Sequence, residues 1–309
     1  MVTSIAVDVA LVAAGVGALW LGAQLFVDNA ALLARRAGLS DLTIGLTVVS
    51  MGTSMPEVAV SVEAALLGSS DIAVGNVVGS NLFNIGFVLG LVALLGGVTA
   101  SRTLVRRDGG VLIASAVLLL AVLLDLRVSR VEGALLLVGF VAYLAYLARS
   151  DDAPVEEVPR MDAALPRSAA AMLAGLVLVV VGATVLVASS SDLARLAGIS
   201  EWLIGVTIVA VGTSSPEIAA SVAAARRGFG GIAAGNLVGS NVFNALGILG
   251  LVAVVRPVTV SAAALPDATW LVGLSVFVVL LFASGRRLSR PEGVLLLAAT
   301  LVRWALDAL

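Results

Sequence analysis

The sequence predicts an all-α polytopic membrane protein, with ten transmembrane helices arranged as two inverted repeats of five helices. Three observations support this fold class. The 309 residues are 60% hydrophobic and 12% charged, with a mean hydropathy of +1.13, which is more apolar surface than a soluble core buries. The apolar residues form continuous runs of about 20 residues, the length that a helix needs to cross a bilayer. The second half of the chain repeats the first at a constant offset of 160 residues.

Ten apolar runs are separated by charged residues, glycines and prolines. The first has no basic leader and is too long for the core of a signal peptide, so we count it as a span. Barrel strands would instead show short alternating patterns. We expect the spans at residues 5–35, 41–67, 72–96, 109–126, 131–148, 169–196, 202–226, 232–255, 267–284 and 291–307.

The repeat covers whole halves of the chain. More than half of the positions from Gly45 to Gly90 are identical in Gly205 to Gly250. Five spans per repeat force the second half to enter the membrane in the opposite orientation, which gives a pseudo-two-fold axis in the membrane plane. We assign the first five-helix repeat to residues 1–150, a short acidic linker to 151–167 and the second repeat to 168–309.

The placement of arginine predicts the orientation. All 18 basic residues are arginines, of which 13 fall on the side of the first interhelical connection and five on the other. The side richer in arginine is cytoplasmic by the positive-inside rule. We therefore expect a multi-pass protein of the cell membrane with a cytoplasmic linker and both termini extracellular.

The chain contains neither cysteine nor histidine. Any metal site is therefore built from oxygen atoms, which suit hard cations such as sodium, calcium and magnesium. No nucleophile, histidine or cofactor motif indicates an enzyme, so we predict no catalytic residues and no cofactor. Nothing in the sequence indicates nucleic-acid binding or an obligate protein partner.

A glutamate lies within one apolar run of each repeat. Glu57 ends residues 52–57 (GTSMPE), and Glu217 ends residues 212–217 (GTSSPE). A carboxylate near the bilayer centre costs about 3 kcal/mol or more unless it is paired or hydrated, so both residues are functional candidates. The alternative is a protonated acid that is hydrogen-bonded between helices, but it explains neither the duplication nor the neighbouring residues.

Pro56 and Pro216 directly precede the two glutamates. Each proline removes a backbone donor and clashes with the preceding turn, so the helix kinks there. We expect the kink to free carbonyl groups about a turn upstream, in residues 50–53 and 210–213, where they face a cavity or a cation. Hydroxyl groups on the same helix face belong to Thr53, Ser54, Thr213 and Ser214.

A second duplicated motif occupies residues 75–84 (GNVVGSNLFN) and 235–244 (GNLVGSNVFN). Glycines four residues apart let two helices approach closely. The polar residues form a stripe that lipid would penalise. We assign ion contact to the deeper members, Ser80, Asn84, Ser240 and Asn244. Asn76 and Asn236 are assigned to helix packing.

The two motifs together supply an oxygen-only cage. Its charge is about −2 if both glutamates ionise, since each carboxylate carries one negative charge. One divalent cation neutralises it, and so do two or three monovalent cations spread over the same oxygens, so the site supports competitive exchange.

At these motifs the chain resembles the cation/calcium exchanger superfamily, specifically its sodium/calcium exchanger branch of prokaryotic type. The resemblance covers nearly the whole chain. It implies transport of calcium and sodium by electrogenic antiport, in which sodium entry drives calcium efflux and two gating helices slide to give alternating access. The metal ligands that it implies are Thr53, Ser54, Glu57, Ser80, Asn84, Thr213, Ser214, Glu217, Ser240, Asn244 and the carbonyls of Ser50 and Ala210.

One position departs from part of this superfamily. Some relatives, including the potassium-dependent branch, carry Asp where this chain has Asn244. The loss of that carboxylate argues against potassium cotransport. A proton/calcium antiporter is the alternative function, although that branch carries a different glutamate motif. A passive channel is disfavoured because a pore usually has its symmetry axis along the membrane normal.

Two other acidic residues lie within predicted spans but have alanine at the corresponding position of the second repeat. Asp28 is expected at a water-accessible helix end. Glu63 lies beyond Glu57 toward the outer surface, where a carboxylate would attract cations to an entrance.

Overall fold

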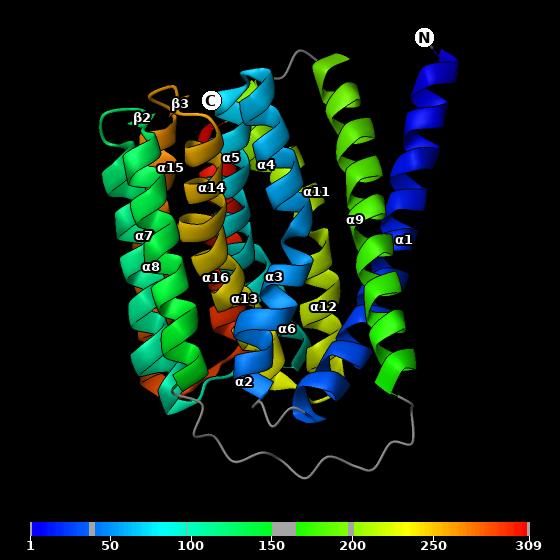
Figure 1. The fold of residues 1–309 in the computed structure, drawn as a ribbon, viewed down its shortest axis with the longest axis vertical. Helices are drawn as coiled ribbons and strands as arrows, with labels where there is room; N and C mark the ends of the chain where they lie inside the picture. Colours follow the sequence, from blue (N-terminus) through cyan, green and yellow to red (C-terminus); the bar gives the residue numbers. More distant parts are fainter. Residues whose placement is uncertain (1, 37–40, 97, 150–164, 197–200, 308–309) are drawn as a thin grey trace.

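The computed structural model describes residues 2–36, 41–96, 98–149, 165–196 and 201–307, and most of these residues are helical. Its helices stand side by side in one bundle, in which α1 begins and α16 ends at the same end of the molecule (Figure 1). Segments η1 to η5 are π-helical turns within longer helices. The first half contains α1 (Val2–Arg36), α2 (Asp41–Ile44), η1 (Gly45–Val49), α3 (Ser50–Thr53), α4 (Met55–Leu67), α5 (Ser70–Leu82), η2 (Phe83–Val88), α6 (Leu89–Gly96), β1 (Val98–Thr99), η3 (Leu104–Asp108), α7 (Gly109–Leu123), β2 (Arg127–Val128) and α8 (Arg130–Arg149).

The second half repeats this order of elements, except that its described residues form no counterpart of η3. It contains α9 (Leu165–Leu196), α10 (Glu201–Leu203), η4 (Ile204–Val209), α11 (Ala210–Thr213), α12 (Ser215–Arg226), α13 (Gly230–Val242), η5 (Phe243–Ile248), α14 (Leu249–Val255), β3 (Val258–Thr259), α15 (Ala264–Gly285), β4 (Arg287–Leu288) and α16 (Arg290–Asp307).

Each apolar run predicted from the sequence is largely helical. The fourth run starts earlier than expected, because η3 begins at Leu104. Helix α9 begins at Leu165, so the last residues of the predicted linker are helical. The remainder of that linker lies outside the described residues.

Fewer helices pass a simple test of length and hydropathy. Five in the described part of the chain are long and apolar enough to cross a membrane, and the bent pair Val206–Thr213 and Ser215–Arg226, with an angle of 46°, would make a sixth. The second predicted span is interrupted at Ser54, whose φ and ψ of −84° and 11° end α3. Ten crossings therefore remain a prediction. The five are Ala6–Phe26, Ser70–Leu95, Arg130–Arg149, Gly230–Val255 and Ala264–Gly285.

The two halves are interlocked by reciprocal contacts. η1 packs on α13 and η4 on α5, while α6 packs on α16 and α14 on α8. The short strands also pair between halves, β1 with β4 and β2 with β3, both antiparallel. Each half therefore completes the core of the other.

Glycine permits the closest of these contacts. A Cβ atom added at Gly79 would lie 2.5 Å from the carbonyl oxygen of Val206, and one at Gly239 would lie 2.6 Å from that of Leu46. Both distances are too short for any side chain. The predicted close approach of helices at these glycines is present in the structure.

Helices α1 and α9 pack along each other at one side of the bundle (Figure 1). Gly22 and Gly175 face each other in this pair, since a Cβ at either would lie 2.8 Å from the other's carbonyl oxygen.

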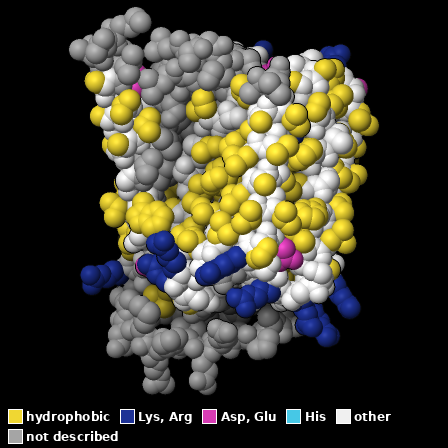
Figure 2. Space-filling model, turned by 180° about the vertical axis from the view of Figure 1, so that it is seen from behind, with side chains coloured by type: hydrophobic (Ala, Val, Ile, Leu, Met, Phe, Trp, Pro, Cys, Tyr) yellow, Lys and Arg dark blue, Asp and Glu magenta, His cyan; other side chains and the backbone are white. Residues whose placement is uncertain are grey.

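Large apolar side chains such as Leu135 and Val138 are 65% and 66% exposed on the outer surface. In Figure 2 apolar side chains cover the middle of one face, and arginines gather below them, at the end where α8 ends and α9 begins.

Candidate cation site

Helix breaks place both glutamates inside the bundle. Ser54 and Ser214 interrupt the helices, and the following segments α4 and α12 start with proline in the first turn. Glu57 and Glu217 lie in those first turns and are fully buried. The break lets each side chain enter the contact between the two halves.

The carbonyls of Ser50 and Ala210 are hydrogen-bonded, contrary to the expectation that the kink frees them. Ser54 N–H donates to the oxygen of Ser50 over 3.0 Å, and Ser214 N–H donates to that of Ala210 over 2.9 Å. The missing donor of Pro56 lies beyond Ser54 in the chain, so the last turn before the break still closes. The same two oxygens also lie near threonine hydroxyls, at 3.4 Å from Thr53 Oγ1 and 3.3 Å from Thr213 Oγ1 respectively.

The two carboxylates are held crosswise between the halves. Ser54 Oγ donates to Glu217 Oε1 over 2.7 Å, and Ser214 Oγ donates to Glu57 Oε1 over 3.0 Å. The second oxygen of each glutamate, Oε2, is buried and has no hydrogen-bond partner among the described residues. Each glutamate therefore has one oxygen open to a ligand, and its ionised form needs one because a buried charge without a partner is costly.

Serine and threonine hydroxyls surround these carboxylates. Ser240 Oγ lies 3.1 Å from Ser54 Oγ, 3.4 Å from Glu217 Oε1 and 3.5 Å from the oxygen of Ser50. Ser80 Oγ lies 3.4 Å from Thr213 Oγ1. The structure thus brings the hydroxyls of both motifs together with residues of the opposite half.

Asn84 and Asn244 lie in η2 and η5 and are fully buried. Neither the amide nitrogen nor the amide oxygen of either side chain has a hydrogen-bond partner in the described part of the chain. Buried amides are normally hydrogen-bonded, so these oxygens fit contact with a cation or with water.

Asn76 and Asn236 differ from that pair because their amides are satisfied. Asn76 Nδ2 donates to Ser61 Oγ over 2.9 Å, and its Oδ1 accepts from Thr213 Oγ1 over 3.0 Å. Asn236 repeats this arrangement with Ser221 and Thr53, over 2.9 and 3.2 Å. These asparagines link the two halves and fix the threonine hydroxyls.

Ser61 and Ser221 were missed as part of this network. Their signal in the sequence is that each lies four residues after its glutamate and is the same residue in both repeats. Asp28 is 3.0 Å from Arg227 in an exposed ion pair, and Glu63 is exposed. Neither acid joins the buried cluster.

The chemistry of the cluster is that of an oxygen site with two charges. Among the described residues, no group of three or more His, Cys, Asp or Glu side chains is arranged to hold a metal ion. The donors are two carboxylates together with neutral hydroxyl, amide and carbonyl oxygens. Such a set suits hard cations and disfavours metals that need nitrogen or sulfur ligands.

Known proteins share both the sequence pattern and the fold. A family model described as "Sodium/calcium exchanger protein" matches residues 7–149 and 167–302. The putative antiporter CaxA of Alkalimonas amylolytica is 37% identical, over 90% of this chain and 91% of that protein. The sodium/calcium exchanger MaX1 of Methanosarcina acetivorans is 31% identical, over 89% of this chain and 91% of that protein.

A solved structure of the sodium-calcium exchanger NCX_Mj superposes with a TM-score of 0.83 at 31% identity, covering 97% of this chain and 98% of that chain. A helical membrane fold of this kind, with these relatives, defines the class of cation/calcium antiporters. The chain belongs to the sodium/calcium exchanger family within the cation/calcium exchanger superfamily. The resemblance based on the two motifs is confirmed. The family consists of transporters and is not a class of enzymes.

Proposed function

We propose that this protein exchanges sodium for calcium, with sodium influx driving calcium efflux, at a site centred on Glu57 and Glu217. One observation carries the proposal: each of two buried glutamates is held by a serine of the opposite half and keeps one oxygen without a hydrogen-bond partner among the described residues. The proposed metal ligands are Glu57, Glu217, Thr53, Ser54, Thr213, Ser214, Ser80, Asn84, Ser240, Asn244 and the carbonyl oxygens of Ser50 and Ala210.

Charge balance explains why the two cargoes compete. One calcium ion neutralises two ionised glutamates. More than one sodium ion is needed for the same charge, and these ions would spread over hydroxyl, amide and carbonyl oxygens as well. Crosswise hydrogen bonds make the site a joint product of both halves, so either cargo contacts both of them. The unpartnered amides of Asn84 and Asn244 support a place for them in this shared set.

The wider topology belongs to the same proposal. Ten spans in two inverted repeats are supported by the reciprocal packing of the halves and by their crosswise strand pairs. A cytoplasmic linker and extracellular termini are supported by the arginines near the linker end of the bundle (Figure 2). We take α1 and α9 as the gating pair, because they pack along each other at one side of the bundle.

A proton/calcium antiporter is the alternative, and one relative is named only as a putative antiporter. The purified protein in proteoliposomes discriminates between the two. We expect calcium uptake when sodium is loaded inside, and none when a pH gradient alone is imposed in sodium-free buffer. Uptake driven by the pH gradient would instead establish proton coupling.

A further inference from the structure

Two buried aspartates lie outside the glutamate site and have no part in the proposed exchange. Asp108 and Asp267 are both 0% exposed, and each is paired with an arginine. Arg107 Nε lies 2.8 Å from Asp108 Oδ1, and Arg303 Nε lies 2.7 Å from Asp267 Oδ1. A buried charge needs an oppositely charged partner, and both aspartates have one. They differ in the second group that each of them contacts.

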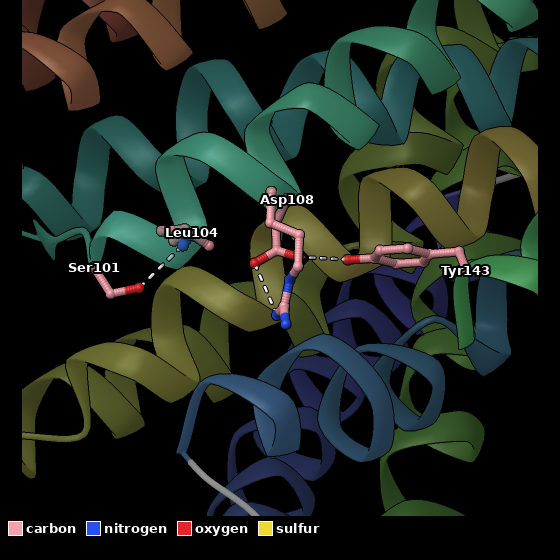
Figure 3. A network of polar contacts seen from close by, with 5 residues as sticks. Ser101, Leu104, Asp108 and Tyr143 are labelled. Carbon is pink, nitrogen blue, oxygen red and sulfur yellow. Dashed lines mark hydrogen bonds and ion pairs between the residues drawn. The ribbon is translucent and has the colours of Figure 1, made fainter. Parts of the chain in front are cut away.

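The second partner of Asp108 is the hydroxyl of Tyr143, which donates to Oδ1 over 3.2 Å (Figure 3). This contact joins η3 to α8, and neither element carries a residue of the glutamate site. Tyr143 lies toward the end of α8, at the linker end of the bundle (Figure 1). Asp108 therefore ties together two helices of the surrounding scaffold.

The second partner of Asp267 is Trp202, whose indole Nε1–H donates to Oδ2 over 3.1 Å. Trp202 lies in α10, the first segment of the broken helix that continues through η4 and α11 to Glu217. Asp267 and Arg303 belong to α15 and α16. This contact therefore ties a helix of the cation site to the scaffold, close to where α16 ends.

Trp202 also packs α10 against α5, the helix that carries Ser80. Its side chain is 8% exposed, and a Cβ added at Gly75 would lie 3.5 Å from the indole ring. One turn further along, the backbone of Val206 lies against Gly79, where an added Cβ would be 2.5 Å from the Val206 carbonyl oxygen. Thr213 then reaches Ser80 Oγ at 3.4 Å. The position of Trp202 thus bears directly on how Thr213 meets the other half.

The Trp202–Asp267 contact has no counterpart at the equivalent positions of the first repeat. At the 160-residue offset, Trp202 corresponds to Leu42, Asp267 to Arg107 and Arg303 to Tyr143. A leucine side chain has no hydrogen-bond donor. Leu42 therefore cannot make the side-chain hydrogen bond that Trp202 makes at the start of the second broken helix.

We propose that Trp202 is a positioning residue, which holds the α10 end of its broken helix through Asp267 and strengthens cation binding from that end of the molecule. The proposal rests on the proposed exchange function. Losing one hydrogen bond to a buried charged group changes an equilibrium by about tenfold. The effect is one-sided because Leu42, at the corresponding position of the first repeat, cannot donate this hydrogen bond.

Trp202→Phe tests the proposal, because it removes the indole donor and keeps an aromatic ring. Tyr143→Phe is the matched control, since it also removes one hydrogen bond to an arginine-paired aspartate. For Trp202→Phe we expect faster amide hydrogen exchange across residues 201–213. We also expect the calcium concentration that half-saturates uptake to rise by about tenfold, only from the α10 end. Tyr143→Phe leaves both quantities unchanged.

Unchanged hydrogen exchange in Trp202→Phe would overturn the role of the contact, as would faster exchange spread over the whole chain. Faster local exchange with equal affinities at both ends would overturn the positioning role. A wild-type protein without sodium-driven calcium uptake would instead contradict the proposed function. Hydrogen exchange would still report on the contact in that case, so the two failures are distinguishable.

Discussion

Neighbouring serines have different roles at the second helix break. Ser214 Oγ donates to Glu57 Oε1 over 3.0 Å, whereas Ser215 Oγ donates to the carbonyl of Val211, four residues earlier in the same half, over 2.8 Å. Only the first of these contacts crosses between the halves and reaches a carboxylate. The pair therefore offers a matched comparison at adjacent positions.

Ser214→Ala is expected to weaken calcium binding by about tenfold or more, because a hydrogen bond to a charged group contributes about 1.5–3 kcal/mol. Ser215→Ala is expected to leave calcium binding unchanged. Isothermal titration of calcium into the purified variants measures both effects. Equal losses in the two variants would show that the crosswise bond has no special part in binding.

The sequence identified the residue types of the site but not their partners. Duplication and depth in the membrane were sufficient to select Glu57 and Glu217 as candidates. The crosswise pairing depends on how the halves fit together, and no spacing within one repeat contains that information. The satisfied amide of Asn76 and the unpartnered amide of Asn84 likewise differ only in three dimensions.

At the scale of elements, close helix contacts depend on glycine. A Cβ at Gly79 would lie 2.5 Å from the carbonyl of Val206, whereas a Cβ at Gly273 would meet nothing within 4 Å. Both glycines lie within helices, α5 and α15. Replacing either glycine by alanine therefore improves helix propensity to the same degree. The two positions differ in the space available for the added methyl group.

Gly79→Ala is expected to lower the melting temperature of the protein, since backbone must shift to admit the methyl group at a cost of about 1–3 kcal/mol. Gly273→Ala is expected to leave it unchanged or raise it slightly, because alanine is the better helix former. Thermal unfolding of the detergent-solubilised variants tests this difference. A melting temperature for Gly79→Ala equal to the wild-type value would contradict the tight contact between η4 and α5.

The helical runs were predictable, but their internal breaks were only partly so. Proline indicated a kink near Glu57, and the structure places the break at Ser54 with an intact turn before it. The π-helical turns have no signature in the apolar pattern, since apolar residues continue through them. The strands β1 to β4 are two residues long and pair between halves, so local sequence does not reveal them.

At the scale of the whole molecule, the inverted orientation of the halves is the main structural prediction. Ser129 and Ser289 are equivalent positions, both exposed, and each caps a helix through Glu132 or Glu292. The chain contains no native cysteine, so a single introduced cysteine is the only thiol. These two positions report the orientation of the two repeats.

We expect an impermeant thiol reagent added to intact cells to label Ser129→Cys and not Ser289→Cys. Permeabilised cells should label both variants, which controls for accessibility. The reason is that an odd number of spans in each repeat puts equivalent loops on opposite sides of the membrane. Labelling of both variants from the outside would refute the inverted arrangement.

The offset of 160 residues was enough to predict an inverted fold, and the reciprocal packing of the halves agrees with it. Differences between the halves were harder to interpret. Leu42 and Trp202 occupy equivalent positions, yet only Trp202 reaches a buried aspartate, contributed by α15. Such asymmetry depends on a residue distant in the chain and becomes visible only in the folded molecule.

The central claim is that Glu57 and Glu217 form one shared site for sodium and calcium. Sodium-gradient-driven calcium uptake by proteoliposomes containing Glu57→Gln, Glu217→Gln or Glu63→Gln tests it most directly. Glu63 lies in the same helix as Glu57 but is exposed, so it controls for the loss of a carboxylate. We predict that either buried substitution abolishes uptake in a folded protein and that Glu63→Gln retains it. Wild-type uptake rates in Glu57→Gln or Glu217→Gln would contradict the account.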